Sequence, residues 1–186
     1  MTDATSSRRK GKSPMKKIGG RTLKPSTLMM GHGFDPMLSE GALKPPIFLT
    51  STFAFENAAA GKRFFEHITG KRKGPADGLV YSRFNNPNFE ILEDRLAVWD
   101  GAERSAVFAS GMAAIATVML AFLRPGDTIL HSRPLYGGTE TLIRNQLTAF
   151  GITPVGFTDG CDPAGIEAAA AAAMAQGRIG LIMLET

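Results

Sequence analysis

Short apolar runs that alternate with helix-like segments are the feature that most constrains the fold of this 186-residue chain. Predicted strands are runs of aliphatic and β-branched residues bounded by Gly, Pro or polar residues: 105–108, 128–131, 153–157 and 179–184. Predicted helices are the segments between and before them: 88–100, 112–123, 139–150 and 163–176. Strands alternating with helices predict parallel crossovers, and therefore an α/β fold with a mostly parallel sheet covered by helices on both faces.

The first of these helices has the clearest local signals. Asn88 is a favourable N-cap, and Asp100-Gly101 is a typical helix end. Apolar residues recur between them on one helical stripe: Phe89, Leu92, Leu96 and Trp99. The apolar segment 112–123 is too short to span a bilayer, so we interpret it as a buried helix.

The N-terminal half has a different composition. Residues 1–30 are polar and basic and are expected to be a disordered tail. Residues 31–85 are expected to form an extended arm and inter-subunit segment, with a short helix around Phe64 and Phe65 and a basic loop at 71–75. Residues 86–186 would then be the first part of the α/β domain, and an end at the tip of a predicted strand suggests a truncated domain.

The charge distribution narrows the possible partners. Residues 1–21 hold seven basic side chains and one acidic one, which leaves 14 and 16 for the remainder, so the net charge of +4 comes from the tail. Such a tail can bind nucleic acid, but no aromatic residues interleave with its charges, so we expect no nucleic-acid partner. No apolar stretch follows the first arginines, and the single cysteine, Cys161, cannot form an internal disulfide. We expect a cytoplasmic protein without a membrane partner.

The strongest chemical signal is the turn between the predicted strand at 105–108 and the next helix. Ser110, Gly111 and Met112 open that helix, and its first backbone N–H groups lack internal partners. With the positive end of the helix dipole behind them, these groups form an anion site suited to phosphate. The alternative is an ordinary turn with Ser110 as N-cap. Neither of the glycine-rich motifs for dinucleotides and nucleoside triphosphates is present.

Two further segments carry candidate ligand groups. Tyr81 and Arg83 lie two residues apart, so in an extended segment they face the same side, where a phenol and a guanidinium suit a phosphate dianion. Tyr136 follows the predicted strand 128–131 at the ligand edge of the sheet, where its ring could stack on a planar cofactor. Taken alone, each could equally be a surface or turn residue.

The motifs occur together in a specific order. They are Tyr81-x-Arg83, Asn86-Pro87, Gly101-Ala102-Glu103, Ala109-Ser110-Gly111-Met112 and Tyr136-Gly137-Gly138-Thr139. In this order, residues 44–186 resemble the Cys/Met-metabolism family of pyridoxal 5′-phosphate enzymes, which includes cystathionine γ-synthase, cystathionine γ-lyase and methionine γ-lyase. The resemblance implies a truncated large domain of the fold-type I aminotransferase class and γ-replacement or β/γ-elimination on sulfur amino acids or O-acylhomoserines.

The resemblance also implies roles for individual residues. Ser110, Gly111 and Met112 match the segment that holds the cofactor phosphate, and Tyr136 matches a tyrosine that stacks on the pyridine ring and assists proton transfer. Tyr81 and Arg83 match a pair that reaches the phosphate of a neighbouring subunit, so the active site would need a dimer, and the family as a whole suggests a homotetramer built from dimers. Glu185-Thr186 matches the start of the family's Glu-[Ser/Thr]-Pro-x-Asn-Pro stretch.

Departures from the family pattern limit what is expected of the chain. Methionine γ-lyases carry a cysteine where this chain has Gly138, which favours γ-replacement of the cystathionine γ-synthase type, and Asn85 stands where a glycine is common. The last lysine is Lys73, so residues 74–186 hold no amine for the cofactor, and the fragment itself is expected to be inactive. A non-catalytic phosphate-ligand binding module, or a degraded gene product, remains an alternative, as does γ-elimination.

Overall fold

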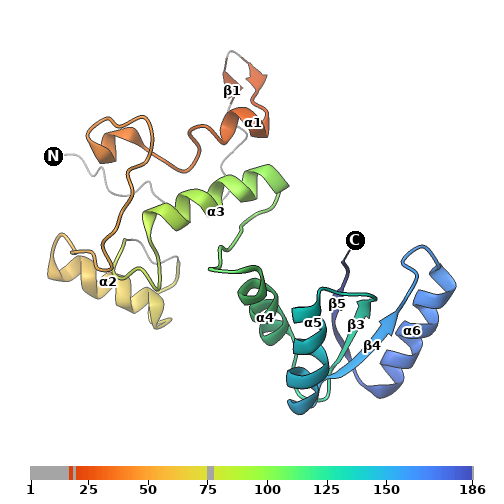
Figure 1. The fold of residues 1–186 in the computed structure, drawn as a ribbon. Helices are drawn as coiled ribbons and strands as arrows, with labels where there is room; N and C mark the ends of the chain where they lie inside the picture. The colour runs from red at the N-terminus through yellow and green to blue at the C-terminus, as the bar shows by residue number, and fades with distance from the viewer. Residues whose placement is uncertain (1–16, 19, 75–77, 186) are drawn as a thin grey trace. The chain divides into compact units, whose positions relative to one another are not determined.

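The computed structural model describes residues 17–18, 20–74 and 78–185 (Figure 1). The chain divides into two compact units, Met1–Val107 and Phe108–Thr186. Described elements of the first unit are the strands β1 (Lys17–Ile18) and β2 (Arg21–Thr22), the helices α1 (Pro25–Leu28), α2 (Ala58–Ile68) and α3 (Pro87–Asp100), and the 3₁₀ helix η1 (Pro36–Ser39). No helix of the described ranges is long and apolar enough to cross a membrane.

The predicted disordered tail is only partly testable. Residues 1–16 and residue 19 lie outside the described residues. The next stretch differs from the prediction, because β1 and β2 pair antiparallel and α1 follows them as a single helical turn. Pro25 at the first position of α1 presets the backbone for that turn.

The N-cap of helix α3 lies two residues earlier than predicted. Asn86, rather than Asn88, is the N-cap, and its side-chain oxygen accepts a hydrogen bond from the Asn88 backbone N–H at 2.9 Å. The reason is Pro87, which is favoured at the first helical position because it has no N–H to satisfy. The predicted end is confirmed, with Gly101 in the left-handed region at φ 65°. Of the predicted stripe, Phe89 and Trp99 are exposed, while the buried residues of α3 are Ile91 and Ala97.

The prediction of a strand over 105–108 is wrong. The segment has no strand partner in the described part of the chain, and two of its polar groups bond to Glu93 of α3 instead. The Ser105 hydroxyl donates to the Glu93 carbonyl at 2.7 Å, and the Val107 N–H donates to the Glu93 carboxylate at 3.0 Å. At Val107 a side chain therefore provides the acceptor that a neighbouring strand would have supplied.

The second unit is the predicted α/β fold. In chain order it contains α4 (Gly111–Phe122), β3 (Thr128–Ser132), α5 (Gly137–Thr141), the π-helical segment η2 (Leu142–Leu147), β4 (Thr153–Phe157), α6 (Pro163–Gln176) and β5 (Ile179–Met183). The three strands are parallel in the order β4-β3-β5, so the central strand is β3. The helix predicted at 139–150 starts at Gly137 and continues through η2.

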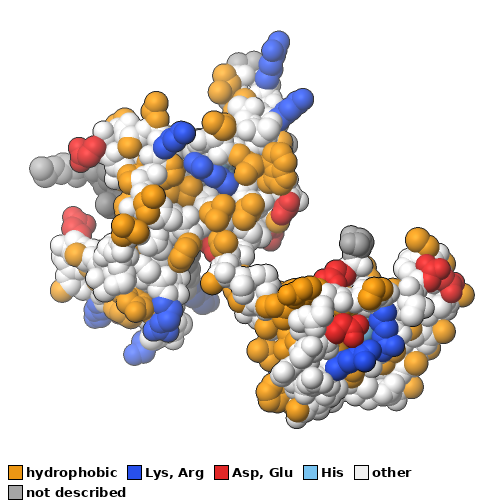
Figure 2. Space-filling view, viewed as in Figure 1, with side chains coloured by type: hydrophobic (Ala, Val, Ile, Leu, Met, Phe, Trp, Pro, Cys, Tyr) orange, Lys and Arg blue, Asp and Glu red, His pale blue; other side chains and the backbone are white. Residues whose placement is uncertain are grey.

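Helices cover both faces of this sheet (Figure 1). On one face, α4, α5 and η2 form a core with the sheet, built from Met119, Leu123, Ile129, Leu135, Ile143, Leu147 and Ile152. On the other face, α6 packs against the sheet through the buried Ala173. The segment predicted as a buried helix is α4, but it is buried along one stripe, the one that faces the sheet: Met119 is buried, whereas Leu120 and Phe122 are exposed. Hydrophobic side chains accordingly show at the surface over α4 (Figure 2).

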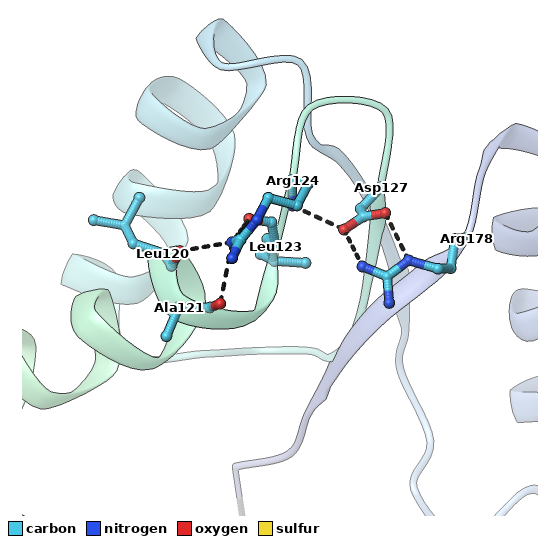
Figure 3. A network of polar contacts seen from close by, with 6 residues as sticks. All are labelled: Leu120, Ala121, Leu123, Arg124, Asp127 and Arg178. Carbon is cyan, nitrogen blue, oxygen red and sulfur yellow. Dashed lines mark hydrogen bonds and ion pairs between the residues drawn. The ribbon is translucent and has the colours of Figure 1, made fainter. Parts of the chain in front are cut away.

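A polar network fixes the amino edge of the sheet, where β3 and β5 begin (Figure 3). The Asp127 carboxylate accepts two hydrogen bonds from the Arg178 guanidinium, at 2.6 and 3.0 Å, and one from the Arg124 N–H at 2.8 Å. The Arg124 guanidinium in turn donates to the last carbonyls of α4, those of Leu120, Ala121 and Leu123. These carbonyls lack intrahelical partners, so the network caps α4 and joins two strands at once.

The network makes stability depend on pH. The hydrogen bonds from Arg178 hold the pKa of Asp127 below its ordinary value, although burial of the carboxylate opposes this shift. A carboxylate with a depressed pKa stabilises the fold above its unfolded-state pKa of about 4 and loses that contribution as the pH falls through the folded value. We therefore expect Asp127→Asn to lower the denaturant midpoint at pH 7, with a difference from wild type that shrinks below about pH 4.

Urea unfolding of the chain followed by circular dichroism at pH 7 and pH 3 measures this difference. Glu167 is an exposed residue of α6, so Glu167→Gln is the matched control and should leave both midpoints unchanged. A constant Asp127→Asn difference across this pH range would contradict the assignment.

The turn before β5 requires a glycine for space rather than for backbone freedom. Gly177 has an extended backbone, but a Cβ there would overlap the backbone carbonyl oxygen of Gly126. Backbone cannot move aside as a flexible side chain can, so we expect Gly177→Ala to destabilise the fold by about 1–3 kcal/mol. Gly160→Ala is the control, because a Cβ at Gly160 meets no atom within 4 Å. Equal unfolding midpoints for the two variants in thermal or urea melts would refute this expectation.

Candidate functional site

Most of the predicted site residues of the second unit lie near the carboxyl edge of its sheet. Tyr136 follows β3 and Glu185 follows β5, and a hydrogen bond links the two residues. Helix α4 reaches the same place, because Met112 at its start contacts the segment after Tyr136. Open α/β sheets bind their ligands at this edge, where the loops and helix starts that follow the strands converge.

The start of α4 leaves two backbone donors free. Ser110 is the N-cap, with its hydroxyl oxygen accepting from the Ala113 N–H at 3.1 Å, so the ordinary capping role foreseen for Ser110 is present. The N–H groups of Gly111 and Met112 find no acceptor among the described residues. A Cβ at Gly111 would meet no atom within 4 Å, so the space in front of these donors is open. Two free donors at the positive end of a 12-residue helix fit a phosphate group.

Met112 and Tyr136 converge over Gly138. A Cβ placed on Gly138 would lie 2.8 Å from Cε1 of the Tyr136 ring and 3.0 Å from Sδ of Met112. The buried Thr139 hydroxyl donates to the same Sδ at 3.9 Å. The missing side chain at 138 therefore leaves room for the ring and the thioether together. Tyr136 is 62% exposed as a residue, which leaves its ring accessible to a planar ligand.

Two residues that the sequence analysis did not assign to the site complete it. The Glu185 carboxylate accepts a hydrogen bond from the Tyr136 backbone N–H. The Glu185 backbone N–H donates to the Ser132 hydroxyl at 3.0 Å, and that hydroxyl donates to the Glu185 carbonyl at 3.4 Å. The available signal was position, because Ser132 ends β3 and Glu185 follows β5, and adjacent parallel strands end side by side.

Tyr81 and Arg83 lie in the first unit and are brought together there. Tyr81 pairs with Thr52 in an isolated antiparallel bridge, supported by the bond from the Phe53 N–H to the Val80 carbonyl at 3.0 Å. The guanidinium carbon of Arg83 lies 5.7 Å from the centroid of the Tyr81 ring and 4.7 Å from that of Phe84. Arg83 has no carboxylate partner in the described part of the chain, so its cationic group is available to an anion.

The arm beside this pair is held by side chains rather than by a sheet. Asn88 accepts from the Phe48 N–H at 2.8 Å and donates to the Pro46 carbonyl at 2.9 Å. Asn85, which departs from the family's glycine, donates to the Gly78 carbonyl at 2.8 Å. These contacts fix the backbone on both sides of Tyr81 and Arg83.

No group of three or more potential metal-ligand side chains gathers anywhere in residues 17–18, 20–74 and 78–185. The buried His131 instead has Nδ1 2.8 Å from the Ser132 carbonyl oxygen. The exposed Cys161 lies in the loop that follows β4, and its N–H donates to the Asp159 carboxylate at 2.8 Å.

Comparison with known proteins relates the chain to one family. A family model described as "Cys/Met metabolism PLP-dependent enzyme" matches residues 26–186, so the likeness begins earlier than the residue 44 expected from the motifs. An L-methionine γ-lyase of Pseudomonas deceptionensis is 38% identical over 77% of this chain and 34% of its own length. An O-succinylhomoserine sulfhydrylase of Pseudomonas aeruginosa is 37% identical over 61% of this chain and 26% of its own length.

A solved structure supports the same relation. It is a protein of Campylobacter jejuni described as a putative O-acetylhomoserine (thiol)-lyase with a pyridoxyl-lysine phosphate, with 29% identity and a TM-score of 0.67. The match covers 78% of this chain and 34% of that one. The chain thus spans about one third of the length of these relatives.

The space over Gly138 can be tested directly. We expect Gly138→Ala to displace the Tyr136 ring, because the new Cβ would lie within 3.0 Å of both the ring and the Met112 thioether. Gly137→Ala is the adjacent control, since a Cβ there meets no atom within 4 Å. The chain has two tyrosines, so NMR spectra with labelled tyrosine rings resolve the change as a shift of one signal. An unmoved Tyr136 signal in Gly138→Ala would show that the ring does not lie over this glycine.

Proposed function

The chain belongs to the family of pyridoxal-phosphate-dependent enzymes of cysteine and methionine metabolism, and from this premise we propose that it supplies the phosphate-binding and ring-stacking part of the cofactor site. The whole protein would catalyse γ-replacement or β/γ-elimination on sulfur amino acids or O-acylhomoserines in the cytoplasm. The observation that carries this proposal is the convergence of the α4 start and Tyr136 over Gly138 at the carboxyl edge of the sheet.

The α4 start would bind the phosphate of the cofactor. The free N–H groups of Gly111 and Met112 would donate to phosphate oxygens, with the helix dipole favouring the negative charge. The Ser110 oxygen is committed to Ala113, but its hydroxyl hydrogen remains available as a third donor. The open space at Gly111 allows a phosphate to approach the backbone closely.

Tyr136 would serve the organic part of the cofactor and the substrate. Its exposed ring would stack on the pyridine, and its hydroxyl would accept and return a proton at the amino-acid substrate. When bound, pyridoxal phosphate supplies the electron sink for carbanion chemistry. The chain's own contribution is therefore to bind, to orient and to move a proton at the Tyr136 oxygen.

A second copy of the chain would complete the phosphate site. Tyr81 and Arg83 would reach the phosphate held by a neighbouring subunit, and Arg83 is suited to this because its guanidinium has no carboxylate partner among the described residues. We propose a homo-oligomer for this reason, with a tetramer built from dimers as its expected form.

Enzymes of this family bind pyridoxal phosphate covalently through a lysine, and the α/β unit of this sequence contains no lysine. Residues 74–186 hold no lysine, so no amine lies in the unit that carries the phosphate donors. We therefore propose that the chain alone recognises the cofactor without forming a specific covalent link to it, and that it is inactive alone.

Gly138 bears on the choice of reaction. A side chain at this position would compete with the Tyr136 ring and the Met112 thioether for the same space, so the cysteine of methionine γ-lyases does not fit here without a rearrangement. This favours γ-replacement, the reaction type of the sulfhydrylases among the relatives. γ-Elimination is the second candidate, because several relatives bear the name L-methionine γ-lyase.

Cofactor recognition by the chain gives one test. We expect titration with pyridoxal phosphate to shift the amide NMR signals of Gly111 and Met112, and inorganic phosphate to compete, because both would occupy the same donors. Pyridoxal without phosphate is the control and should leave these signals in place. Borohydride should trap no stoichiometric adduct on a single lysine, as measured by mass spectrometry. A single stoichiometric lysine adduct, or no amide shift with pyridoxal phosphate, would refute the proposed role.

The choice between reactions needs the whole protein. We expect thioether or homocysteine formation from O-acylhomoserine with cysteine or sulfide to exceed the release of thiol from methionine alone by at least about 10-fold in kcat/KM, which is about 1.4 kcal/mol in transition-state stabilisation. Both rates are measured on one preparation by chromatography of the products. Faster turnover of methionine alone would decide for γ-elimination.

A further inference from the structure

We propose that Glu185 is a positioning residue for Tyr136, and that Ser132 holds Glu185 in place for this purpose. The inference rests on the proposed function of Tyr136 as the residue that stacks on the cofactor. It assigns to Glu185 a task beyond its place in the sequence motif: its carboxylate fixes the backbone of Tyr136 and thereby fixes where the ring lies.

The Tyr136 side chain is not held by burial. Its exposed fraction is 62%, and the helix that follows, α5, is only five residues long before the π-helical segment begins. The preceding Leu135 is buried in the core, so the chain is anchored on that side of Tyr136. What remains to be fixed is the backbone at Tyr136 itself, because that backbone sets the origin and direction of the ring.

Glu185 supplies this contact from the neighbouring strand. Tyr136 is the N-cap residue of α5, and its N–H donates to the Glu185 carboxylate across 49 positions of sequence. A hydrogen bond from a backbone N–H to a carboxylate is charge-assisted and stronger than one between neutral groups.

Ser132 makes the carboxylate a fixed point. The Glu185 backbone is bonded to the Ser132 hydroxyl through both its N–H, at 3.0 Å, and its carbonyl, at 3.4 Å. Ser132 is the last residue of the central strand β3, which pairs with β5 on one side and β4 on the other. Tyr136 is therefore tied back to the sheet by a closed path that runs from β3 through residues 133–135 to Tyr136, across to Glu185, and back to β3.

This closed path also fixes the position of the Tyr136 ring relative to the start of α4. The start of α4 and the ring of Tyr136 come together at Gly138, where a Cβ would lie close to both the Met112 thioether and the ring, two residues after the bond to Glu185. If the Tyr136 backbone were released, the ring could shift while the α4 donors stayed in place. Glu185 thus controls the register between the phosphate donors and the stacking ring.

The first test uses the 186-residue chain without cofactor and compares Glu185→Ala with Glu185→Gln. Loss of the carboxylate acceptor should speed hydrogen exchange of the Tyr136 amide by about 10-fold or more, whereas glutamine keeps an acceptor oxygen and should largely restore protection. The Tyr136 ring signal should move in Glu185→Ala and stay near wild type in Glu185→Gln. Ser132→Ala should show the same two changes in weaker form, and Glu167→Ala on exposed α6 is the control.

The second test uses the whole holoenzyme and a double-mutant cycle with Tyr136→Phe. Because Glu185 acts through Tyr136, Glu185→Ala should lower kcat and alter the cofactor absorption spectrum in the wild-type background, and should add little in the Tyr136→Phe background. A merely structural cap would lower the unfolding midpoint without moving the ring signal or the spectrum.

The outcomes separate this inference from the proposed function. An unchanged Tyr136 ring signal in Glu185→Ala, or additive effects of Glu185→Ala and Tyr136→Phe, would overturn the positioning role. A whole protein that binds no pyridoxal phosphate would overturn the proposed function. The ring position and the amide exchange of the free chain would still decide whether Glu185 holds Tyr136.

Discussion

The parallel pairing of β3 with both β4 and β5 is the constraint on which the rest of the second unit depends. Its residues Thr128 to His131 are buried on both faces, so the strand cannot slip without exposing apolar side chains or leaving backbone groups unpaired. Because β3 is central, each neighbouring segment is placed relative to it. The helix starts and strand ends that carry the candidate site are therefore positioned by the core rather than by their own loops.

Polar side chains join β3 to β5 at both ends, with different results. At the amino edge, Asp127 is buried and its carboxylate accepts hydrogen bonds from the Arg178 guanidinium and the Arg124 N–H, so the network only stabilises the fold. At the carboxyl edge, Glu185 is exposed and holds a backbone N–H whose residue carries an exposed ring. The same device, a carboxylate bridging two strands, thus closes the sheet at one edge and organises a ligand surface at the other.

Elements that depend on periodicity and local motifs could be predicted from the sequence. Features that depend on a contact with a residue far away in the sequence could not. Strands β3, β4 and β5 and the open start of α4 follow from apolar runs and from Ser110-Gly111, and the structure confirms them. The strand expected at 105–108 is absent, and the Val107 N–H donates instead to the Glu93 carboxylate, a contact that no local pattern contains. The bond from Tyr136 to Glu185 joins positions 49 residues apart, so only the strand order could have revealed it.

In the candidate site the backbone is held by hydrogen bonds, whereas the ring of Tyr136 and the N–H groups at the start of α4 are exposed to a ligand. This difference explains why two positions of the site are glycines. Glycines stand where room is needed: at Gly111 no protein atom fills the space, and at Gly138 the space is filled by Tyr136 and Met112. A larger residue at the first position would obstruct a ligand, whereas at the second it would displace the protein's own ring. Gly111 thus leaves room for a ligand, and Gly138 leaves room for the protein's own side chains. Substitutions at Gly111 should therefore weaken phosphate binding, while those at Gly138 should change how the Tyr136 ring stacks on the cofactor.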